Sequence, residues 1–294
     1  ILTQRKPANG GSKRFEMLHQ IDLPFAPKAA EFVGTDHVVV ADCFGGRLAV
    51  VDCETGVISS EYELPVHNIR DIAVGLDGRL YLTCQRLNPK AYADYEDIHW
   101  GILIENEVLA VRPEALIAPR GKRALSPERI SLGGPGEGAG DPASIAVTSN
   151  QFVVSLAGTD EVAIVDRVGV RQSRVPVGRR PVSVIRDAEA NLAYVVNSLS
   201  DSVSIVDLMD NRLVDTISLA PSPSPGPVER GEVAFFSAKL SHEHWMSCHS
   251  CHTDGHTNNG LADTLGDGDF GDAKRVPTLR GVWATGPWAW NGSQ

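Results

Sequence analysis

The sequence lacks any apolar run near the roughly 18 residues that a membrane-spanning helix needs, so it predicts no membrane span. Its first 13 residues read as polar coil rather than as a signal peptide, from which we expect a mature form or a fragment. Basic residues are also few. The chain has 27 Lys and Arg and 37 Asp and Glu, which gives a formal net charge of -10. That acidity argues against nucleic acid and anionic membranes as partners.

Cysteine is scarce as well, with five residues in a chain of 294. That is too few for the dense disulfide framework of a small secreted domain. Cys43, Cys53 and Cys84 lie in the first part, and three cysteines allow at most one disulfide among themselves. The sequence allows a disulfide between Cys43 and either Cys53 or Cys84 and does not decide between the two. The sequence also lacks a nucleophile triad, a glycine-rich phosphate loop and the H-E-x-x-H motif of zinc proteases.

Two parts of the chain differ in composition, and the change falls near residue 220. Before it, valine-rich alternating stretches are separated by Gly, Asp and Asn turns. After it come a Pro/Ser stretch and a tail that holds five of the nine histidines and four of the five tryptophans. At 42% hydrophobic residues the chain can bury a sizeable core. We therefore divide it into residues 1–220, a linker at 221–228 and a second domain at 229–294.

The first part is repetitive. A typical repeat consists of a strand-like stretch, a polar turn and a second strand-like stretch that closes on Asp, and two such closing residues, Asp166 and Asp207, lie about 41 residues apart. That spacing is within the period of the four-stranded blades of a β-propeller. About four blades are legible, the second of them degenerate, at residues 38–52, 71–82, 153–166 and 195–207.

Short motifs mark the starts and ends of these repeats. Residues 142–147 and 181–185 open on Pro and run into apolar positions, and Tyr194-Val-Val-Asn197 lies in another strand. On these motifs the region from about 15 to 220 resembles the YVTN family of β-propellers, which implies blades that bury their faces against each other. Another antiparallel β-sandwich is the alternative. Residues 85–141, rich in Pro, Gly and charge, are expected to form a long, partly irregular insertion.

The tail contains Cys248-His249-Ser250-Cys251-His252, a C-x-x-C-H motif that is typical of c-type haem attachment. Residues three apart share one face of a helical turn, so both thiols can reach the vinyl groups of one porphyrin. His252 follows the second thiol directly and can place its imidazole on the iron as the proximal ligand. The motif predicts haem c bound through Cys248, Cys251 and His252.

Three other interpretations compete for the two cysteines of this motif. A thioredoxin-like redox pair is expected in a βαβ setting, which the surrounding sequence lacks. A structural zinc site could use both cysteines and two nearby histidines. A disulfide between Cys248 and Cys251 would close a strained short loop.

The order of motifs in the tail carries a second resemblance. A short helix predicted at 231–241 ends in Leu-Ser, and the C-x-x-C-H motif is followed by a Gly/Asp-rich loop, by Arg275-Val-Pro-Thr-Leu-Arg280 and by Trp288-Ala-Trp-Asn-Gly292. Residues 229–294 thereby resemble the first haem domain of the bacterial di-haem cytochrome c peroxidase family, which includes methylamine-utilisation enzymes. The resemblance implies a small α-helical cytochrome c domain.

This second resemblance also implies roles for single residues. Trp290 falls where the family has a Trp between its two haems, so it would act as an electron relay, although Asn291 replaces the usual Asp. Some members supply a distal histidine late in the loop, and this loop has none there, so the sixth iron ligand stays open. The first candidate for it is His256, in the loop after the motif. The other candidates are His242, His244 and Met246.

Charged residues of the tail have two interpretations each. Arg275 and Arg280 can bind haem propionates, since a guanidinium fits a planar carboxylate, or they can form ordinary surface ion pairs. An acidic run is compatible with calcium, a hard ion with oxygen ligands, but it lacks EF-hand spacing and we interpret it as a solvated loop. Its members are Asp263, Asp267, Asp269 and Asp272.

Together these patterns predict a mostly β protein, in which a partial β-propeller is joined to a small α-helical cytochrome c domain. The function they favour is electron transfer by a c-type haem, in the service of a di-haem peroxidase-type reaction. They also predict a redox partner protein and a periplasmic or otherwise exported location. The alternative is a propeller that binds a partner protein or ligand, with the haem only as a relay. We also expect further blades, and a second haem domain, to come from outside this chain.

Overall fold

The computed structural model describes residues 2–5, 14–117, 125–167, 172–221, 224–263 and 273–288. The fold is built on four antiparallel sheets of four strands each, and every one of these sheets is a meander of consecutive strands. Blade 1 contains β3 (Pro27–Val33), β4 (His37–Asp42), β5 (Arg47–Asp52) and β6 (Ile58–Glu63). Blade 2 contains β7 (His67–Val74), β8 (Leu80–Leu87), β9 (Ile104–Val111) and β10 (Glu128–Ser131). Blade 3 contains β11 (Pro142–Val147), β12 (Gln151–Leu156), β13 (Glu161–Asp166) and β14 (Gln172–Pro176). Blade 4 contains β15 (Pro181–Asp187), β16 (Leu192–Asn197), β17 (Ser202–Asp207) and β18 (Arg212–Ser218).

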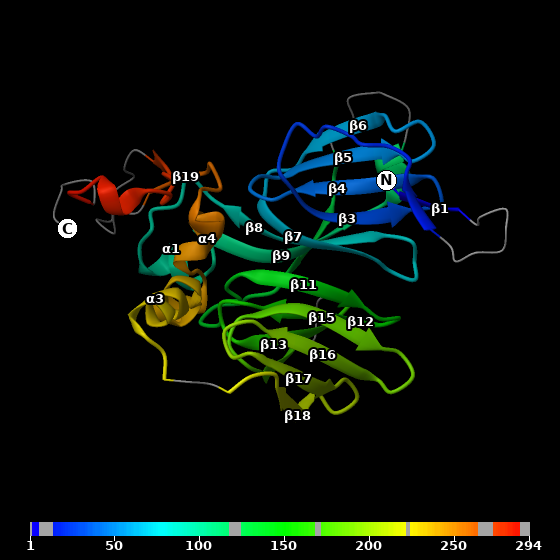
Figure 1. Cartoon of the computed structure of the whole chain (residues 1–294). Coiled ribbons are helices and arrows are strands. Elements are labelled where there is room, and N and C mark those ends of the chain that lie inside the picture. Colours follow the sequence, from blue (N-terminus) through cyan, green and yellow to red (C-terminus); the bar gives the residue numbers. More distant parts are fainter. Residues whose placement is uncertain are drawn as a thin grey trace.

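The four sheets are arranged as propeller-like blades (Figure 1). The first strand of each sheet lies beside the first strand of the next, so β3 contacts β7, β7 contacts β11 and β11 contacts β15. The prediction of a mostly β chain with about four blades is confirmed at this level. Each pair of strands predicted from the repeats, such as residues 153–166, is the second and third strand of a blade or, at 71–82, the first and second.

Alternation along a strand decides which neighbouring blade each side chain meets. In β12, Phe152, Val154 and Leu156 are buried in the cluster shared with blade 2. Val153, between them, belongs to the cluster shared with blade 4. Successive side chains of a strand point to opposite faces of its sheet, so an apolar run such as 152–156 suits a blade covered on both sides. The core of the protein is thus divided among the blade interfaces.

The long connections of blade 2 explain why the repeat in its sequence is degenerate. The insertion predicted at 85–141 contains β9 and β10, which complete the blade, so it is irregular only between its strands. Two short helices lie in those connections, α1 (Tyr95–His99) before β9 and α2 (Pro113–Ile117) after it. Asp94 caps α1 by accepting a hydrogen bond from the backbone N–H of Asp97 at 2.8 Å.

The two ends of the row of blades differ. At the N-terminal end, β2 (Arg14–Met17) pairs with β1 (Leu2–Arg5). The segment after β2 packs Ile21, Leu23 and Phe25 against the outward face of blade 1. At the other end, every residue of β18 is exposed. Among the described residues, the outward face of blade 4 is therefore the barer of the two.

The tail begins with α3 (Pro227–Phe236), in place of the helix predicted at 231–241. Gly226 precedes it as N-cap and Pro227 occupies the first turn, where a missing N–H costs nothing. The elements after it are short: η1 (Ala238–Leu240), η2 (His242–His244), α4 (Cys248–Cys251), η3 (Thr253–Gly255), β19 (Leu261–Ala262), β20 (Lys274–Arg275) and η4 (Val282–Ala284). The expected helical domain is thus a series of short elements, part of which lies directly on the propeller (Figure 1). None of the helices in the described ranges is long and apolar enough to cross a membrane.

Candidate haem-binding site

Residues 237–258, called the docked segment below, lie on one face of the propeller. Backbone hydrogen bonds join this segment to connections on blades 2 and 3: Gly138 N–H donates to the Glu243 carbonyl at 2.7 Å, and Gly140 N–H to the His244 carbonyl at 3.0 Å. On the turn between β12 and β13, the Gly158 carbonyl accepts from the N–H of Ala238 at 2.8 Å. The tail is thereby fixed to the propeller before the C-x-x-C-H motif begins.

Trp245 is wedged into the propeller three residues before the first motif cysteine. Its side chain is 2% exposed. A Cβ placed on Gly133 would lie 2.7 Å from the indole ring, and one on Gly101 would lie closer still. Glycine is therefore favoured at both positions, since a Cβ there would press against the ring.

The motif turn α4 is held by its own cap and by a carboxylate of the propeller. The hydroxyl of Ser247 accepts from the His249 N–H at 3.0 Å, while Ser250 Oγ accepts from the Ser247 N–H at 3.0 Å, which makes a capping box. Both hydroxyls donate to the buried Asp141 just before β11, the one of Ser250 at 2.7 Å. The serine side of the turn thus faces the propeller, while Cys248 is exposed.

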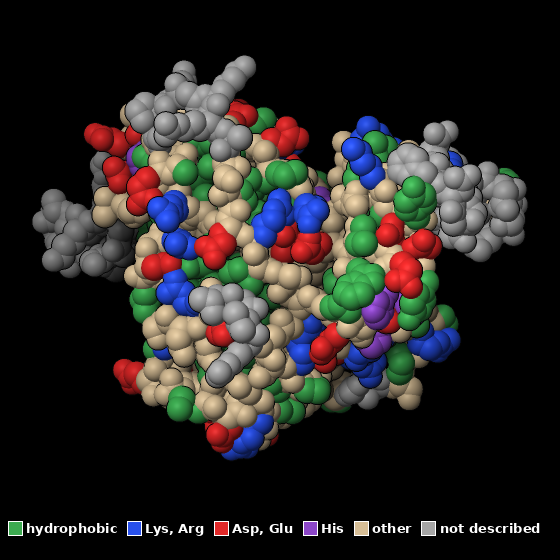
Figure 2. Space-filling model, turned by 180° about the vertical axis from the view of Figure 1, so that it is seen from behind, with side chains coloured by type: hydrophobic (Ala, Val, Ile, Leu, Met, Phe, Trp, Pro, Cys, Tyr) green, Lys and Arg blue, Asp and Glu red, His purple; other side chains and the backbone are tan. Residues whose placement is uncertain are grey.

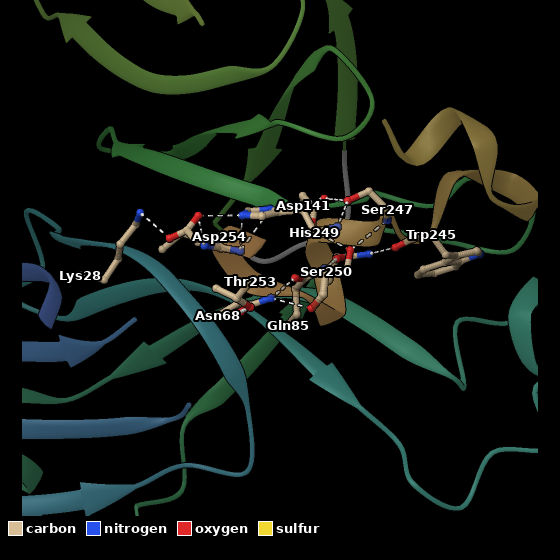
Figure 3. Close-up of polar contacts among 12 residues, drawn as sticks. Lys28, Asn68, Gln85, Asp141, Trp245, Ser247, His249, Ser250, Thr253 and Asp254 are labelled. Carbon is tan, nitrogen blue, oxygen red and sulfur yellow. Dashed lines mark hydrogen bonds and ion pairs between the residues drawn. The ribbon is translucent and has the colours of Figure 1, made fainter. Parts of the chain in front are cut away.

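A chain of buried amides anchors the other side of the docked segment (Figure 3). Asn68 donates from Nδ2 to the carbonyl of Ser250 and to Oε1 of Gln85, each at 2.7 Å, and accepts from the Thr253 hydroxyl. Gln85 donates to Asn106 Oδ1 at 2.8 Å, and Asn106 donates to the Trp245 carbonyl at 2.9 Å. The three amides are at most 1% exposed. Because unpaired buried amides are costly, this chain specifies where the segment lies.

His249, inside the motif, points into the propeller. Its Nε2 lies 3.0 Å from Oδ1 of Asp254, and its Nδ1 lies 3.3 Å from an Arg70 guanidinium nitrogen. Burial and the neighbouring Arg70 lower the pKa of His249, against the opposing effect of Asp254. The hydrogen bond from His249, with the nearby Arg70 and Lys28, holds the pKa of Asp254 well below its usual range. A neutral His249 that donates to Asp254 and accepts from Arg70 satisfies all three groups.

His252 has the arrangement that a metal-binding histidine needs. Its Nδ1 lies 2.9 Å from the carbonyl oxygen of Pro277. A carbonyl only accepts, so Nδ1 carries the proton and Nε2 presents a lone pair. Fixing the tautomer from behind in this way is what partners of metal-ligating histidines do. The residues of the motif therefore fit an iron ligand at His252 Nε2.

The state of the cysteines bears on the four interpretations of the motif. All five cysteines are free, so neither the disulfide within the motif nor one among Cys43, Cys53 and Cys84 is formed. Burial raises the pKa of Cys251 to about 12, with smaller contributions from Asp141 and Cys248. Reactive and zinc-binding cysteines instead need a stabilised thiolate. Within the described ranges no three His, Cys, Asp or Glu side chains converge as a metal site.

The candidates for the sixth iron ligand lie at different places. His256 places its Nδ1 2.7 Å from the hydroxyl of Thr278, and its ring meets Phe44 edge to face at 5.3 Å. His252 and His256 thus share the 277–278 stretch. His242 packs on Tyr95, with ring centroids 4.8 Å apart, while His244 is exposed and Met246 half-buried. Nothing brings these four together, and the sixth ligand stays a prediction.

The remaining residues predicted for the site are spread over the end of the chain. Arg275 donates to the backbone and side-chain oxygens of Asn259 at 2.8 and 2.7 Å, and Arg280 is exposed, so propionate binding by either stays a prediction. Asp263 is buried. The other predicted residues, Trp290, Asn291, Asp267, Asp269 and Asp272, lie outside the described residues.

Sequence reasoning missed the propeller's own contribution to the site. Asn68, Asp141 and Arg180 stand at the start of β7 or just before β11 and β15, all with left-handed backbone, φ 53°, 56° and 53°. The first two bind the motif turn, and the guanidinium of Arg180 lies 3.4 Å from the ring centre of Phe236 at the end of α3. A polar residue before a Pro-opened strand, as in Asp141-Pro142 and Arg180-Pro181, is a signal that could have indicated them.

No protein-family model matches the sequence, and no curated protein is significantly similar to it. Among solved structures, the chain is similar to a functionally unknown protein from Desulfotomaculum acetoxidans, at 15% identity over 72% of this chain and 64% of that one, with a TM-score of 0.50. It is also similar to the hydrazine synthase of Kuenenia stuttgartiensis (18% identity, 58% and 55%, TM-score 0.49) and to the virginiamycin B lyase of Staphylococcus aureus (13%, 75% and 64%, 0.49). The aligned region spans less than two thirds of each of these chains. Identities this low concern the fold alone.

Proposed function

We propose that this chain is a c-type haem protein of electron transfer whose haem-bearing turn is built onto a β-propeller. The observation that carries the proposal is the hydrogen-bonding distance between His252 Nδ1 and the Pro277 carbonyl, within an intact C-x-x-C-H turn. That contact occupies Nδ1 of His252 and leaves Nε2 as the nitrogen that can bind iron. The exposed Cys248 lies on the same turn, while the residues between the cysteines bind the propeller.

Each residue of the turn has one task under this proposal. Cys248 and Cys251 form thioethers, and a neutral sulfur tolerates the burial that disfavours a thiolate at Cys251. His252 supplies the proximal nitrogen, while Asp141 and Asn68 hold the turn still. When bound, haem c supplies one-electron redox chemistry, and the protein tunes it through ligand, burial and hydrogen bonds. A periplasmic or otherwise exported location and a redox partner protein accompany the proposal.

The test of attachment is expression of the whole chain with a c-type maturation system. We expect haem that resists acid–acetone extraction and gives the pyridine haemochrome spectrum of a c-type haem. Cys248→Ala together with Cys251→Ala should abolish it, while Cys53→Ala, a half-buried cysteine on blade 1, should not. His252→Ala should keep the attached haem and change the iron spectrum. Haem that washes out, or stoichiometric zinc in its place, contradicts the proposal.

We further propose that the intact protein serves a di-haem peroxidase-type reaction, supported by the motif order of residues 229–294 and its resemblance to that family. Reducing peroxide to water takes two electrons, and the second haem of the family would follow this sequence. We therefore expect the 294-residue chain alone to turn over peroxide poorly with a reduced cytochrome donor. A form extended past Gln294 should be faster. Rapid turnover by the short chain, unaffected by Trp290→Phe, would show that the two-haem analogy fails.

A further inference from the structure

An exposed aromatic surface lies beside the docked segment, on α1 and the residues after it. Tyr95 and Trp100 are each 58% exposed, and Ile102 is 46% exposed. His99 connects the two aromatic residues, since its ring stacks on Tyr95 at 5.8 Å and meets Trp100 edge to face at 5.3 Å. Figure 2 shows hydrophobic side chains gathered with His and acidic groups on this side of the molecule.

Negative charge prevails along the chain around these rings, although Lys90 lies directly before the stretch. The stretch from 91 to 102 carries three carboxylates, on Asp94, Glu96 and Asp97, and neither Lys nor Arg. Glu96 is exposed, and its carboxylate accepts from the Trp100 indole N–H at 3.3 Å. Glu243 of the tail adds a fourth carboxylate next to His99, with 2.9 Å between Oε2 and Nδ1. The aromatic surface is thus bordered by acidic groups.

This surface is joined rigidly to the haem-binding turn. The ring of Trp245 fills the space at Gly101, directly after Trp100, and Glu243 links α1 to the docked segment. Trp245 and Glu243 are three and five residues before Cys248. Contacts made on the aromatic surface are therefore made beside the redox group that we propose.

We propose that Tyr95, Trp100 and Ile102, with their acidic border, form the docking surface for a basic, lysine-rich electron-carrier protein. This inference rests on the proposed function and names the partner class for the same site. Large exposed aromatic residues are the usual anchors of protein interfaces, and a contiguous exposed apolar patch marks such sites. The four carboxylates select a cationic partner and suppress binding of an anionic one. Lysine ammonium groups can also lie on the aromatic faces.

The experiment measures binding of the whole chain to a basic c-type cytochrome with lysines around its haem edge, by calorimetry at low and high salt. We expect binding that weakens with salt, and no comparable binding of an acidic cytochrome. Trp100→Ala and Glu96→Lys should each weaken it about tenfold. The matched controls are Leu76→Ala, 78% exposed in the turn after β7, and Glu189→Lys, exposed after β15; neither should change binding.

The other outcomes of this experiment either overturn the docking surface or separate it from the proposed function. Equal binding of both cytochromes, or affinities unchanged in Trp100→Ala and Glu96→Lys, overturns the inference. Sedimentation showing a dimer that Trp100→Ala dissociates also overturns it, because a second copy would then cover the surface. Calorimetry needs no electron transfer, so the two proposals can fail separately. Binding by a chain that carries no haem after c-type maturation supports this surface, while the maturation result itself rejects the proposed function. Haem-loaded chain that binds neither cytochrome rejects the surface alone.

Discussion

The blades hold each other and the docked segment is held by the blades, but the two contacts differ in chemistry. Between blades 2 and 3 the contact is apolar, with Phe152, Val154 and Leu156 fully buried. The motif turn is held instead by buried polar groups, Asp141 and Asn68 foremost. Apolar burial stabilises without direction, whereas a hydrogen bond requires its partner at one place. The blade interfaces therefore supply stability, and the polar contacts fix the position of the turn.

The largest effect is expected at the blade interface. Phe152→Ala removes a fully buried ring that lies 4.7 Å from the ring of Tyr81, between centroids. The free energy of unfolding should fall by about 3–5 kcal/mol, measured by urea denaturation. Ile185→Ala, 65% exposed on blade 4, is the control and should change it by less than about 0.5 kcal/mol. Equal losses in both variants would mean that the blade interfaces do not supply the stability.

Acid should lower the free energy of unfolding through His67, a buried histidine of blade 2. Burial lowers the pKa of His67 to about 4, with a smaller contribution from Arg70, against 6.5 in the unfolded chain. The unfolded state therefore binds more protons between these values, and the free energy of unfolding should fall by up to about 3 kcal/mol from pH 7 to pH 4. His67→Gln should flatten that part of the pH profile. An unchanged profile would show that the pKa of His67 does not differ between the folded and the unfolded chain.

A smaller loss of stability, confined to the docked segment, is expected from Asp141→Asn. The amide accepts only one of the two serine hydroxyls that Asp141 binds, so one buried hydroxyl loses its partner, at a cost of about 2 kcal/mol. Hydrogen exchange of residues 247–258 in the haem-free chain should become faster, while that of the blades should not. Asp187→Asn is the control, since the Asp187 carboxylate accepts backbone hydrogen bonds from Glu189 and Ala190 in the turn after β15. Uniformly faster exchange would make Asp141 a general stability residue.

The smallest effect is expected at the tryptophan wedge. Gly133→Ala places a Cβ against the Trp245 ring and should cost about 1 kcal/mol, with a change in tryptophan fluorescence. A Cβ on the neighbouring Gly134 meets nothing within 4 Å, so Gly134→Ala should change neither quantity. Identical behaviour of the two variants would show that Trp245 does not occupy this space in solution.

The blades could be predicted from the sequence because their signal is local. Alternating valines and polar turns recur within each pair of strands, as in residues 153–166, and the structure forms those pairs. Blade 2 was harder, since β8 and β9 are separated by a loop with its own helix. A connection of that length hides the period of the repeat, and its composition resembles that of an irregular insertion.

The haem motif could be predicted from the sequence, but the propeller residues that surround it could not. Cys248 to His252 carry their meaning in their spacing, whereas Asn68 and Asp141 act from positions far away in the chain. Their left-handed backbone and their hydrogen bonds arise only once the blades are packed. The exposed aromatic residues of α1 were missed for a similar reason, because only the fold shows that they face solvent beside the tail.

The most direct test of the central claim is mass spectrometry of the matured, denatured chain followed by peptide mapping. We predict the added mass of one haem on the peptide that contains residues 248–252, retained after denaturation. The double variant Cys248→Ala, Cys251→Ala should show the unmodified mass. A matured wild-type chain with no added mass on that peptide would contradict the account.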